Sequence, residues 1–198
     1  LVEKSTATGC SYSDYWEIYS SVRRIRPQYA LERGSGISSA AIATALKHNS
    51  EEYGVTGLLV SMEELDEYHN QIKGIFLSEL RPYVDFRQSA RVVENYGSMK
   101  GVCYETVPDH PYTFVFVDGP NHRSPVTGVK LFNSDFVNVV ARSQAPVFGL
   151  VDQRITTLWA LRRLLPTASI RYVPTKALTF VDGATQNDLL LPDLTNDR

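Results

Sequence analysis

Short runs of β-branched and aromatic residues alternate with longer amphipathic stretches along this chain, and this alternation constrains the fold more than any other feature. Such runs predict strands at 29–32, 56–62, 83–89, 112–117 and 146–151. Helical spacing of apolar residues predicts helices at 14–25, 38–48, 64–77, 91–98, 133–143 and 154–165. Strand then helix, repeated, is typical of parallel βαβ units with helices on both faces of one sheet. We therefore expect an α/β fold built as a three-layer sandwich.

The C-terminal part of the chain departs from this alternation. Strands are predicted at 169–173 and 177–181, and the link between them is too short for a parallel crossover. We therefore expect an antiparallel hairpin that completes a mostly parallel seven-stranded sheet. The segment 182–198 is polar and broken by proline, which predicts a loose tail.

The N-terminal segment 1–28 is predicted to be helical and is rich in aromatic residues. Tyr12, Tyr15, Trp16 and Tyr19 suit either core packing or a lid over a site. The core domain is then expected at 29–181. Both interpretations of the aromatic residues stay open at the level of the sequence.

Charge and cysteine content exclude several classes of protein. The 198 residues carry a formal net charge of −2, which gives no basic field for nucleic acid. Cys10 and Cys103 have no paired spacing, so neither a disulfide scaffold nor a zinc site is expected. No apolar run is long enough to span a bilayer, and we expect no membrane partner. A reducing cytoplasm fits this composition best.

A glycine-rich turn lies where the first strand of the sheet meets its helix. Glu32 ends the strand, and Gly34, Ser35 and Gly36 follow it at the carboxyl edge, where open α/β sheets bind ligands. Glycines there let a ligand approach backbone N–H groups at a helix start. Ser39 stands where a dinucleotide fingerprint needs its third glycine, which weakens NAD and FAD as ligands.

The stretch ERGSGIS resembles the E-x-G-x-G-x-S first motif of class I S-adenosylmethionine-dependent methyltransferases. In that family the acid and neighbouring backbone groups hold the methionine end of the cofactor. The resemblance implies a Rossmann-like domain and S-adenosylmethionine as the cofactor. It also implies cofactor-binding roles for residues of this stretch: Glu32, Gly34, Ser35, Gly36 and Ser38.

Later strand ends extend the resemblance. Glu63 follows the second strand, where the family's second motif places a carboxylate on the ribose diol. Ser89 and Ala90 follow the third strand, near the expected adenine position. Asp118 ends the strongly apolar fourth strand, as in the Val-Asp-Gly motif of many small-molecule O-methyltransferases. The resemblance therefore implies cofactor contacts at Glu63, Ser89, Ala90 and Asp118, and methyl transfer to a hydroxyl of a small-molecule acceptor.

Two catalytic arrangements around Asp118 are open. His122 follows it closely and suits a general base, since histidine titrates near neutral pH. Alternatively, Asp118, Asp152 and Gln153 at neighbouring strand ends form part of a shell for Mg²⁺, similar to the acid and amide pair of catechol-type methyltransferases.

Other functions compete with a methyltransferase. A nucleotide-linked, NAD-type oxidoreductase would use the same sheet, and a non-catalytic methyltransferase-fold protein would keep the fold without activity. The sequence identifies neither the acceptor nor the oligomeric state, so a homo-oligomer stays open.

Overall fold

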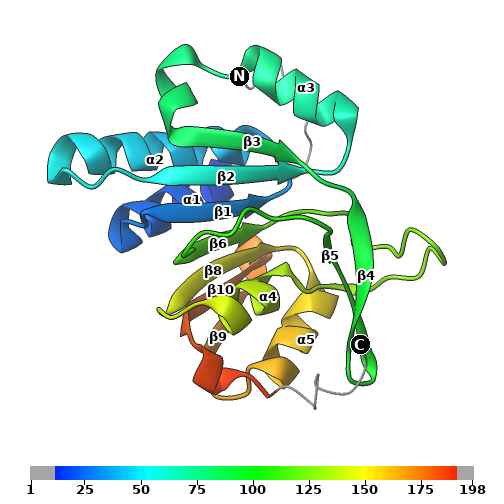
Figure 1. Cartoon of the computed structure of the whole chain (residues 1–198). Helices are drawn as coiled ribbons and strands as arrows, with labels where there is room; N and C mark the ends of the chain where they lie inside the picture. The colour runs from blue at the N-terminus through cyan, green and yellow to red at the C-terminus, as the bar shows by residue number, and fades with distance from the viewer. Residues whose placement is uncertain (1–11, 191–198) are drawn as a thin grey trace.

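The computed structural model describes residues 12–190 and contains a seven-stranded sheet in the order β3-β2-β1-β6-β8-β10-β9 (Figure 1). Its strands are β1 Tyr29–Arg33, β2 Leu58–Glu63, β3 Val84–Gln88, β6 Phe114–Val117, β8 Val147–Asp152, β9 Ser169–Val173 and β10 Leu178–Ala184. The pairs among β3, β2, β1, β6 and β8 are parallel, whereas β10 is antiparallel to β8 and to β9. The predicted mostly parallel sheet with a C-terminal antiparallel hairpin is confirmed.

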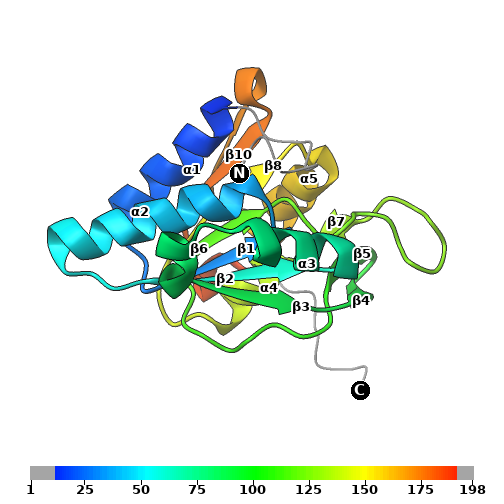
Figure 2. The ribbon, with the colours of Figure 1, turned by 90° about the horizontal axis from the view of Figure 1, so that it is seen from above.

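Helices cover both faces of this sheet, as a three-layer sandwich requires. The α-helices are α1 Tyr12–Ile25, α2 Ile37–Tyr53, α3 Asp66–Ile75, α4 Asp135–Arg142 and α5 Ile155–Leu164. Short 3₁₀ helices are η2 Ser78–Tyr83, η3 Pro174–Lys176 and η4 Gln186–Asp188. Seen from above, α1, α2 and α3 lie over one face (Figure 2). Among residues 12–190, no helix has the length and apolar character needed to cross a membrane.

Alternation along the strands directs buried side chains to opposite faces of the sheet. Ala30 faces α1 and α2, where it packs with Ile18 and Leu46. Leu31, the next residue, faces the other side and belongs to the cluster that contains Phe136 of α4 and Leu161 of α5. Because successive strand side chains point to opposite faces, Glu32 belongs to the α2 side and Arg33 to the α4 side.

The predicted helix at 91–98 is wrong, because this segment forms a second sheet. β4 Arg91–Tyr96 and β5 Met99–Tyr104 form an antiparallel hairpin, and β7 Phe132–Asn133 pairs with β5. Gly97 occupies the turn with φ 57, a conformation that favours glycine. Val92 and Val93 are β-branched and suit a strand, although their spacing from Tyr96 also fits a helix.

The ends of the chain are described only in part. Residues 1–11 and 191–198 lie outside the described range, as do the corresponding parts of the predicted segment 1–28 and tail 182–198. Within the range, α1 packs on α2, and Ile18 and Val22 are fully buried. β10 continues to Ala184, past the predicted strand end at 181, and the backbone N–H of Leu190 donates to Leu164 O.

Candidate active site

A cavity of about 570 Å³ opens at the carboxyl ends of β1, β2 and β6. It is lined by the turn after β1, the start of α3 and the loop after β6: Gly34, Ser35, Gly36, Glu63, Glu64, Leu65, Tyr68, Gln71, Ile72, Ile75, Tyr104, Asp118, Gly119, Pro120, Asn121, His122 and Arg154. This is the edge at which open α/β sheets bind ligands. The structure therefore brings six of the predicted site residues to one cavity, and their roles stay predictions: Gly34, Ser35, Gly36, Glu63, Asp118 and His122.

The two loops that form the floor of the cavity touch through glycines. Gly34 has φ 103, and a Cβ placed on it would lie 2.9 Å from the backbone nitrogen of Gly119. A Cβ on Gly119 would in turn lie 2.8 Å from Gly34 Cα and 3.0 Å from the hydroxyl of Tyr104. Glycine at both positions is thus required by contact between the two backbones, in addition to any approach by a ligand.

Glu32 lies beneath this turn and does not line the cavity. Its side chain is fully buried, and Oε2 accepts hydrogen bonds from the hydroxyls of Ser39 and Ser61. Burial raises the pKa of Glu32 to about 7, and hydrogen bonds from Ser38, Ser39 and Ser61 oppose that shift. Its second oxygen, Oε1, is buried with no hydrogen-bond partner in the described chain. The contacts of Glu32 and Ser38 with a cofactor stay predictions.

Glu63 stands at the end of β2 with its carboxylate held in place. Oε1 accepts from the backbone N–H groups of Glu64 at 2.8 Å and Leu65 at 3.0 Å. Burial raises the pKa of Glu63, and these backbone hydrogen bonds oppose the rise. The carboxylate is thus fixed at the cavity wall in the orientation set by the start of α3.

Glu64 is a site residue that the sequence analysis did not identify. Arg91 Nη1 donates to both carboxylate oxygens of Glu64, at 2.8 and 3.1 Å, and Glu64 Oε1 accepts from the backbone N–H of Asn121 at 2.9 Å. Glu64 therefore joins the end of β2 to the hairpin and to the loop after β6. A second acid at a strand end was visible in the sequence, but its partners were not.

Ser89 and Ala90 do not line the cavity. Ser89 Oγ accepts from the backbone N–H of Thr106 at 2.9 Å, and the N–H of Ser89 donates to Glu63 O. The carbonyl of Ala90 accepts from the N–H of Glu105. These contacts anchor the β4–β5 hairpin beside the end of β2, and a role near the adenine stays a prediction.

Asp118 forms a carboxyl pair with Asp152 beside a guanidinium group. The two side chains share a hydrogen bond, and burial raises the pKa of both. The pKa of Asp152 rises to about 7 through burial and the negative charges of Asp118 and Asp14. The Arg154 guanidinium lies 3.7 Å from Asp118 Oδ1 and counteracts the rise at Asp118. Asp118 and Asp152 therefore titrate as a pair, and burial favours the protonated form of each carboxyl group.

Arg154 organises the loop after β6 and is the second residue that the sequence analysis missed as part of the site. It donates to the carbonyls of Asp118 and Pro120 and to Asn133 Oδ1. The sequence offered only its position after the fifth parallel strand, which equally suits a helix start. These bonds come from Nη1 and Nη2, whereas the buried Nε has no hydrogen-bond partner among the described residues.

His122 lines the cavity but faces a cation. His122 Nδ1 lies 3.4 Å from Arg154 Nη1. Because the arginine nitrogen can only donate, His122 Nδ1 accepts with its lone pair. Desolvation lowers the pKa of His122, and Arg154, Lys130 and Arg123 lower it further. His122 is therefore neutral near pH 7, with its basic nitrogen turned toward a guanidinium group.

Only two of the three predicted metal ligands, Asp118 and Asp152, lie together, and Mg²⁺ is not supported. Gln153 is exposed, has φ 39 and does not line the cavity. Arg154 supplies the positive charge beside Asp118. Across residues 12–190, no cluster of three or more His, Cys, Asp or Glu side chains is arranged to hold a metal ion. The described residues thus do not fit a hard-cation site.

Known proteins resemble this chain in structure and not in sequence. No protein-family model and no curated protein matches the sequence. An O-methyltransferase from Bacillus cereus in complex with S-adenosylhomocysteine superposes with a TM-score of 0.56 at 14% identity, over 91% of this chain and 85% of that one. The O-methyltransferase TomG from Streptomyces achromogenes, in complex with S-adenosylmethionine, gives 0.54 at 14%, over 89% and 82%.

The chain has the class I methyltransferase fold. A methyltransferase from Geobacter sulfurreducens agrees, with a TM-score of 0.55 at 12% identity over 89% of this chain and 80% of that one. The strand order and the antiparallel β10 belong to this Rossmann-like fold. Likeness at 12–14% identity shows the fold alone.

Proposed function

We propose that this protein is an S-adenosylmethionine-dependent methyltransferase that transfers a methyl group to a hydroxyl of a small-molecule acceptor. One observation carries the proposal: the glycine turn after β1, Glu63 after β2 and Asp118 after β6 line a single cavity at the carboxyl edge of the sheet. The methyltransferase fold of the chain supports the same class of reaction.

The residues of the cavity fit this cofactor. Glu63 has a fixed carboxylate, which suits the two hydroxyls of a ribose as hydrogen-bond donors. Gly36 precedes the first residue of α2, where the partial positive charge of the helix start suits a carboxylate. Glu32 lies beneath the glycine turn and does not line the cavity, so it would favour an ammonium group at the same end of the ligand through its charge and not by direct contact. When bound, S-adenosylmethionine supplies an electrophilic methyl group on a sulfonium.

Asp118 is the group best placed to take the acceptor proton. It lines the cavity, its pKa is raised by burial, and its hydrogen bond to Asp152 lets the pair hold a proton. The Asp118 carboxylate would accept the proton of the acceptor hydroxyl as the acceptor oxygen bonds the methyl carbon, and the electron pair of the broken methyl–sulfur bond would stay on the sulfur of S-adenosylhomocysteine. His122 is the second candidate, but it would first have to turn its Nδ1 away from Arg154.

Calorimetry with S-adenosylmethionine, S-adenosylhomocysteine and NAD tests the cofactor assignment. We expect the two methionine-derived ligands to bind and NAD not to bind. Glu63→Ala should weaken S-adenosylhomocysteine roughly 10–100-fold, because charge-assisted hydrogen bonds are lost. Glu67 is an exposed residue of α3, so Glu67→Ala is the matched control and should leave the affinity for S-adenosylhomocysteine unchanged. Preferential NAD binding would instead support the oxidoreductase.

A screen of hydroxylated small molecules then tests the reaction. S-adenosylhomocysteine formation that depends on the added acceptor would support methyl transfer, and mass analysis of the product would locate the methyl group. Tight cofactor binding with no turnover over a broad acceptor set would favour a non-catalytic binding protein of the same fold.

A further inference from the structure

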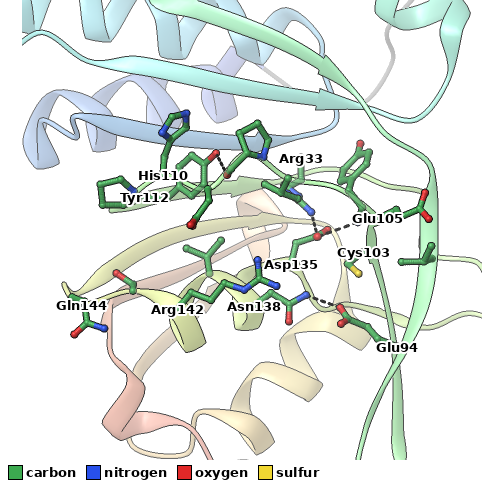
Figure 3. Close-up of a pocket in the computed structure, with 18 of the residues that line it drawn as sticks. Arg33, Glu94, Cys103, Glu105, His110, Tyr112, Asp135, Asn138, Arg142 and Gln144 are labelled. Carbon is green, nitrogen blue, oxygen red and sulfur yellow. Dashed lines mark hydrogen bonds and ion pairs between the residues drawn. The ribbon is translucent and has the colours of Figure 1, made fainter. Parts of the chain in front are cut away.

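A second cavity, of about 420 Å³, lies on the α4 side of the sheet (Figure 3). The β4–β5 hairpin forms one wall, α4 the other, and the segment 107–112 before β6 closes the end. Its lining includes the segments that enter β6 and β8 and also Arg33 at the carboxyl end of β1. Tyr104 lines both cavities and separates this one from the proposed cofactor site.

A buried ion pair forms the base of this second cavity. Arg33 and Asp135 are 1% and 2% exposed, and their side chains form an ion pair. Asp135 Oδ1 also accepts from the backbone N–H of Tyr104 at 3.2 Å. The Arg33 guanidinium lies 4.6 Å from the centre of the Tyr104 ring. These contacts hold both charged groups in place on the cavity lining.

The ion pair leaves polar atoms without partners. Asp135 Oδ2 and Arg33 Nε are buried, and neither has a hydrogen-bond partner within residues 12–190. A buried polar atom without a partner costs free energy, and such atoms on a cavity wall are points that a ligand can satisfy. Asp135 Oδ2 can only accept while ionised, so it calls for an N–H or O–H donor.

The remaining lining combines apolar surface with excess negative charge. Val92, Val107, Val139 and Tyr112 supply the apolar part. Four carboxylates and two guanidinium groups line the cavity, an excess of two negative charges: Glu94, Glu105, Asp109, Asp135, Arg33 and Arg142. Glu94 is positioned by hydrogen bonds from Ser134 and Asn138, both at 2.6 Å. An anion would be repelled from this lining, whereas a cation would be attracted.

We propose that this cavity is a second small-molecule site, which takes an organic cation with an aromatic or apolar body and an N–H donor. The volume lies within the usual range of ligand pockets, about 300–1,000 Å³. The ammonium group would be neutralised by the carboxylates, and one donor would reach Asp135 Oδ2. This site is separate from the proposed acceptor position at Asp118, and the proposal does not rest on the methyltransferase activity.

The test uses the full chain and three matched probes: tryptamine, the neutral tryptophol and the anionic indole-3-propionate. Amide chemical shifts are followed during titration. We expect saturable shifts with tryptamine for backbone amides of α4 and β5, with at least roughly tenfold weaker binding of indole-3-propionate. Equal binding of cation and anion, or no saturable shift with millimolar tryptamine, would overturn the proposal.

Two variants assign the binding to this cavity. Val139→Trp fills the cavity without removing the ion pair, so it should abolish the tryptamine shifts while thermal unfolding stays cooperative. The double variant Glu105→Gln, Asp109→Asn should weaken tryptamine roughly fivefold and leave tryptophol unchanged. Glu79→Gln, an exposed acid outside this lining, is the matched control. Persistence of the tryptamine shifts in folded Val139→Trp would place the binding elsewhere.

Discussion

Gly34 and Gly119 touch backbone to backbone, so that a Cβ on Gly34 would approach the nitrogen of Gly119 to 2.9 Å. This contact joins the end of β1 to the end of β6, the two strands that deliver the glycine turn and Asp118. A side chain at either position would push the two loops apart. The shape of the proposed cofactor site therefore depends on direct contact between the backbones of Gly34 and Gly119.

Gly34→Ala should destabilise the protein and weaken S-adenosylhomocysteine binding. We expect a loss of roughly 3 kcal/mol, because the new methyl group overlaps Gly119 and the residue keeps φ 103. Gly54→Ala is the control, since Gly54 has φ 68 but no atom within 4 Å of its added Cβ. It should cost only about 1–2 kcal/mol. Urea unfolding measures both, and equal losses would show that the Gly119 contact adjusts freely.

Asp118→Asn should abolish most turnover, while His122→Gln should retain most of it. Asparagine cannot accept the proton, so we expect kcat to fall about 10²–10⁴-fold. His122 has its basic nitrogen directed at Arg154, so its loss should matter less. Steady-state kinetics with an acceptor found by the screen, together with cofactor affinity for each variant, makes the comparison. The opposite ranking would assign the proton transfer to His122.

The pH dependence of turnover should report the titration of the Asp118–Asp152 pair. Burial raises the pKa of Asp118 and raises that of Asp152 to about 7. A base must be deprotonated, so activity should increase as the pH rises through neutrality and then level off. The apparent pKa belongs to the pair and not to either residue alone.

Arg154→Met should shift this pH profile upward. The guanidinium lies 3.7 Å from Asp118 Oδ1 and favours the ionised carboxylate. Without that charge, the pKa of the pair should rise, and the ascending limb should move to higher pH. Arg154→Lys keeps the charge and should move the limb less. An unchanged limb in folded Arg154→Met would mean that the titrating group is not the Asp118 pair.

The strand ends were predictable from sequence, whereas the contacts between them were not. Glu63 and Asp118 each follow an apolar run, and parallel strands place such residues at one edge of the sheet. Arg154 had no comparable signal, because its partners Asp118, Pro120 and Asn133 lie in other segments of the chain. Gln153 was predicted as a ligand because it follows Asp152 at a strand end and resembles the amide of catechol-type methyltransferases, but with φ 39 it is exposed.

The β4–β5 hairpin was not predicted, because the spacing of its apolar residues fits a helix as well as a strand. Val92, Val93 and Tyr96 fit one face of a helix, and only pairing with β5 makes them a strand. The second cavity depends on this hairpin, so it was equally hidden. Arg33 directly follows the predicted strand 29–32 and had no visible partner, because its ion pair with Asp135 forms only when α4 packs on the sheet.

The Arg33–Asp135 pair should behave as a buried ion pair in stability measurements. Asp135→Leu or Arg33→Met alone leaves an uncompensated buried charge, and each should cost about 3–5 kcal/mol. The double variant Arg33→Met, Asp135→Leu should recover most of that loss, because no charge remains unpaired. Chemical unfolding of the set measures the coupling. Additive losses in the double variant would show that the two side chains contribute independently.

Glu32 should make the protein less stable as the pH rises through neutrality. Burial raises its pKa in the folded protein from 4.5 to about 7. The folded state therefore binds more protons than the unfolded state between these values, and this stabilising contribution, on the order of 3 kcal/mol, is fully present below pH 4.5 and is lost as the pH rises to about 7. Glu32→Gln removes the titration. We expect the variant to match the parent near pH 5 and to exceed it in stability near pH 8. Urea unfolding of both proteins at several pH values measures the difference in the free energy of unfolding. Glu79→Gln, which removes an exposed acid, is the control. A difference between parent and Glu32→Gln that stays constant across this range would show that Glu32 is already ionised in the fold.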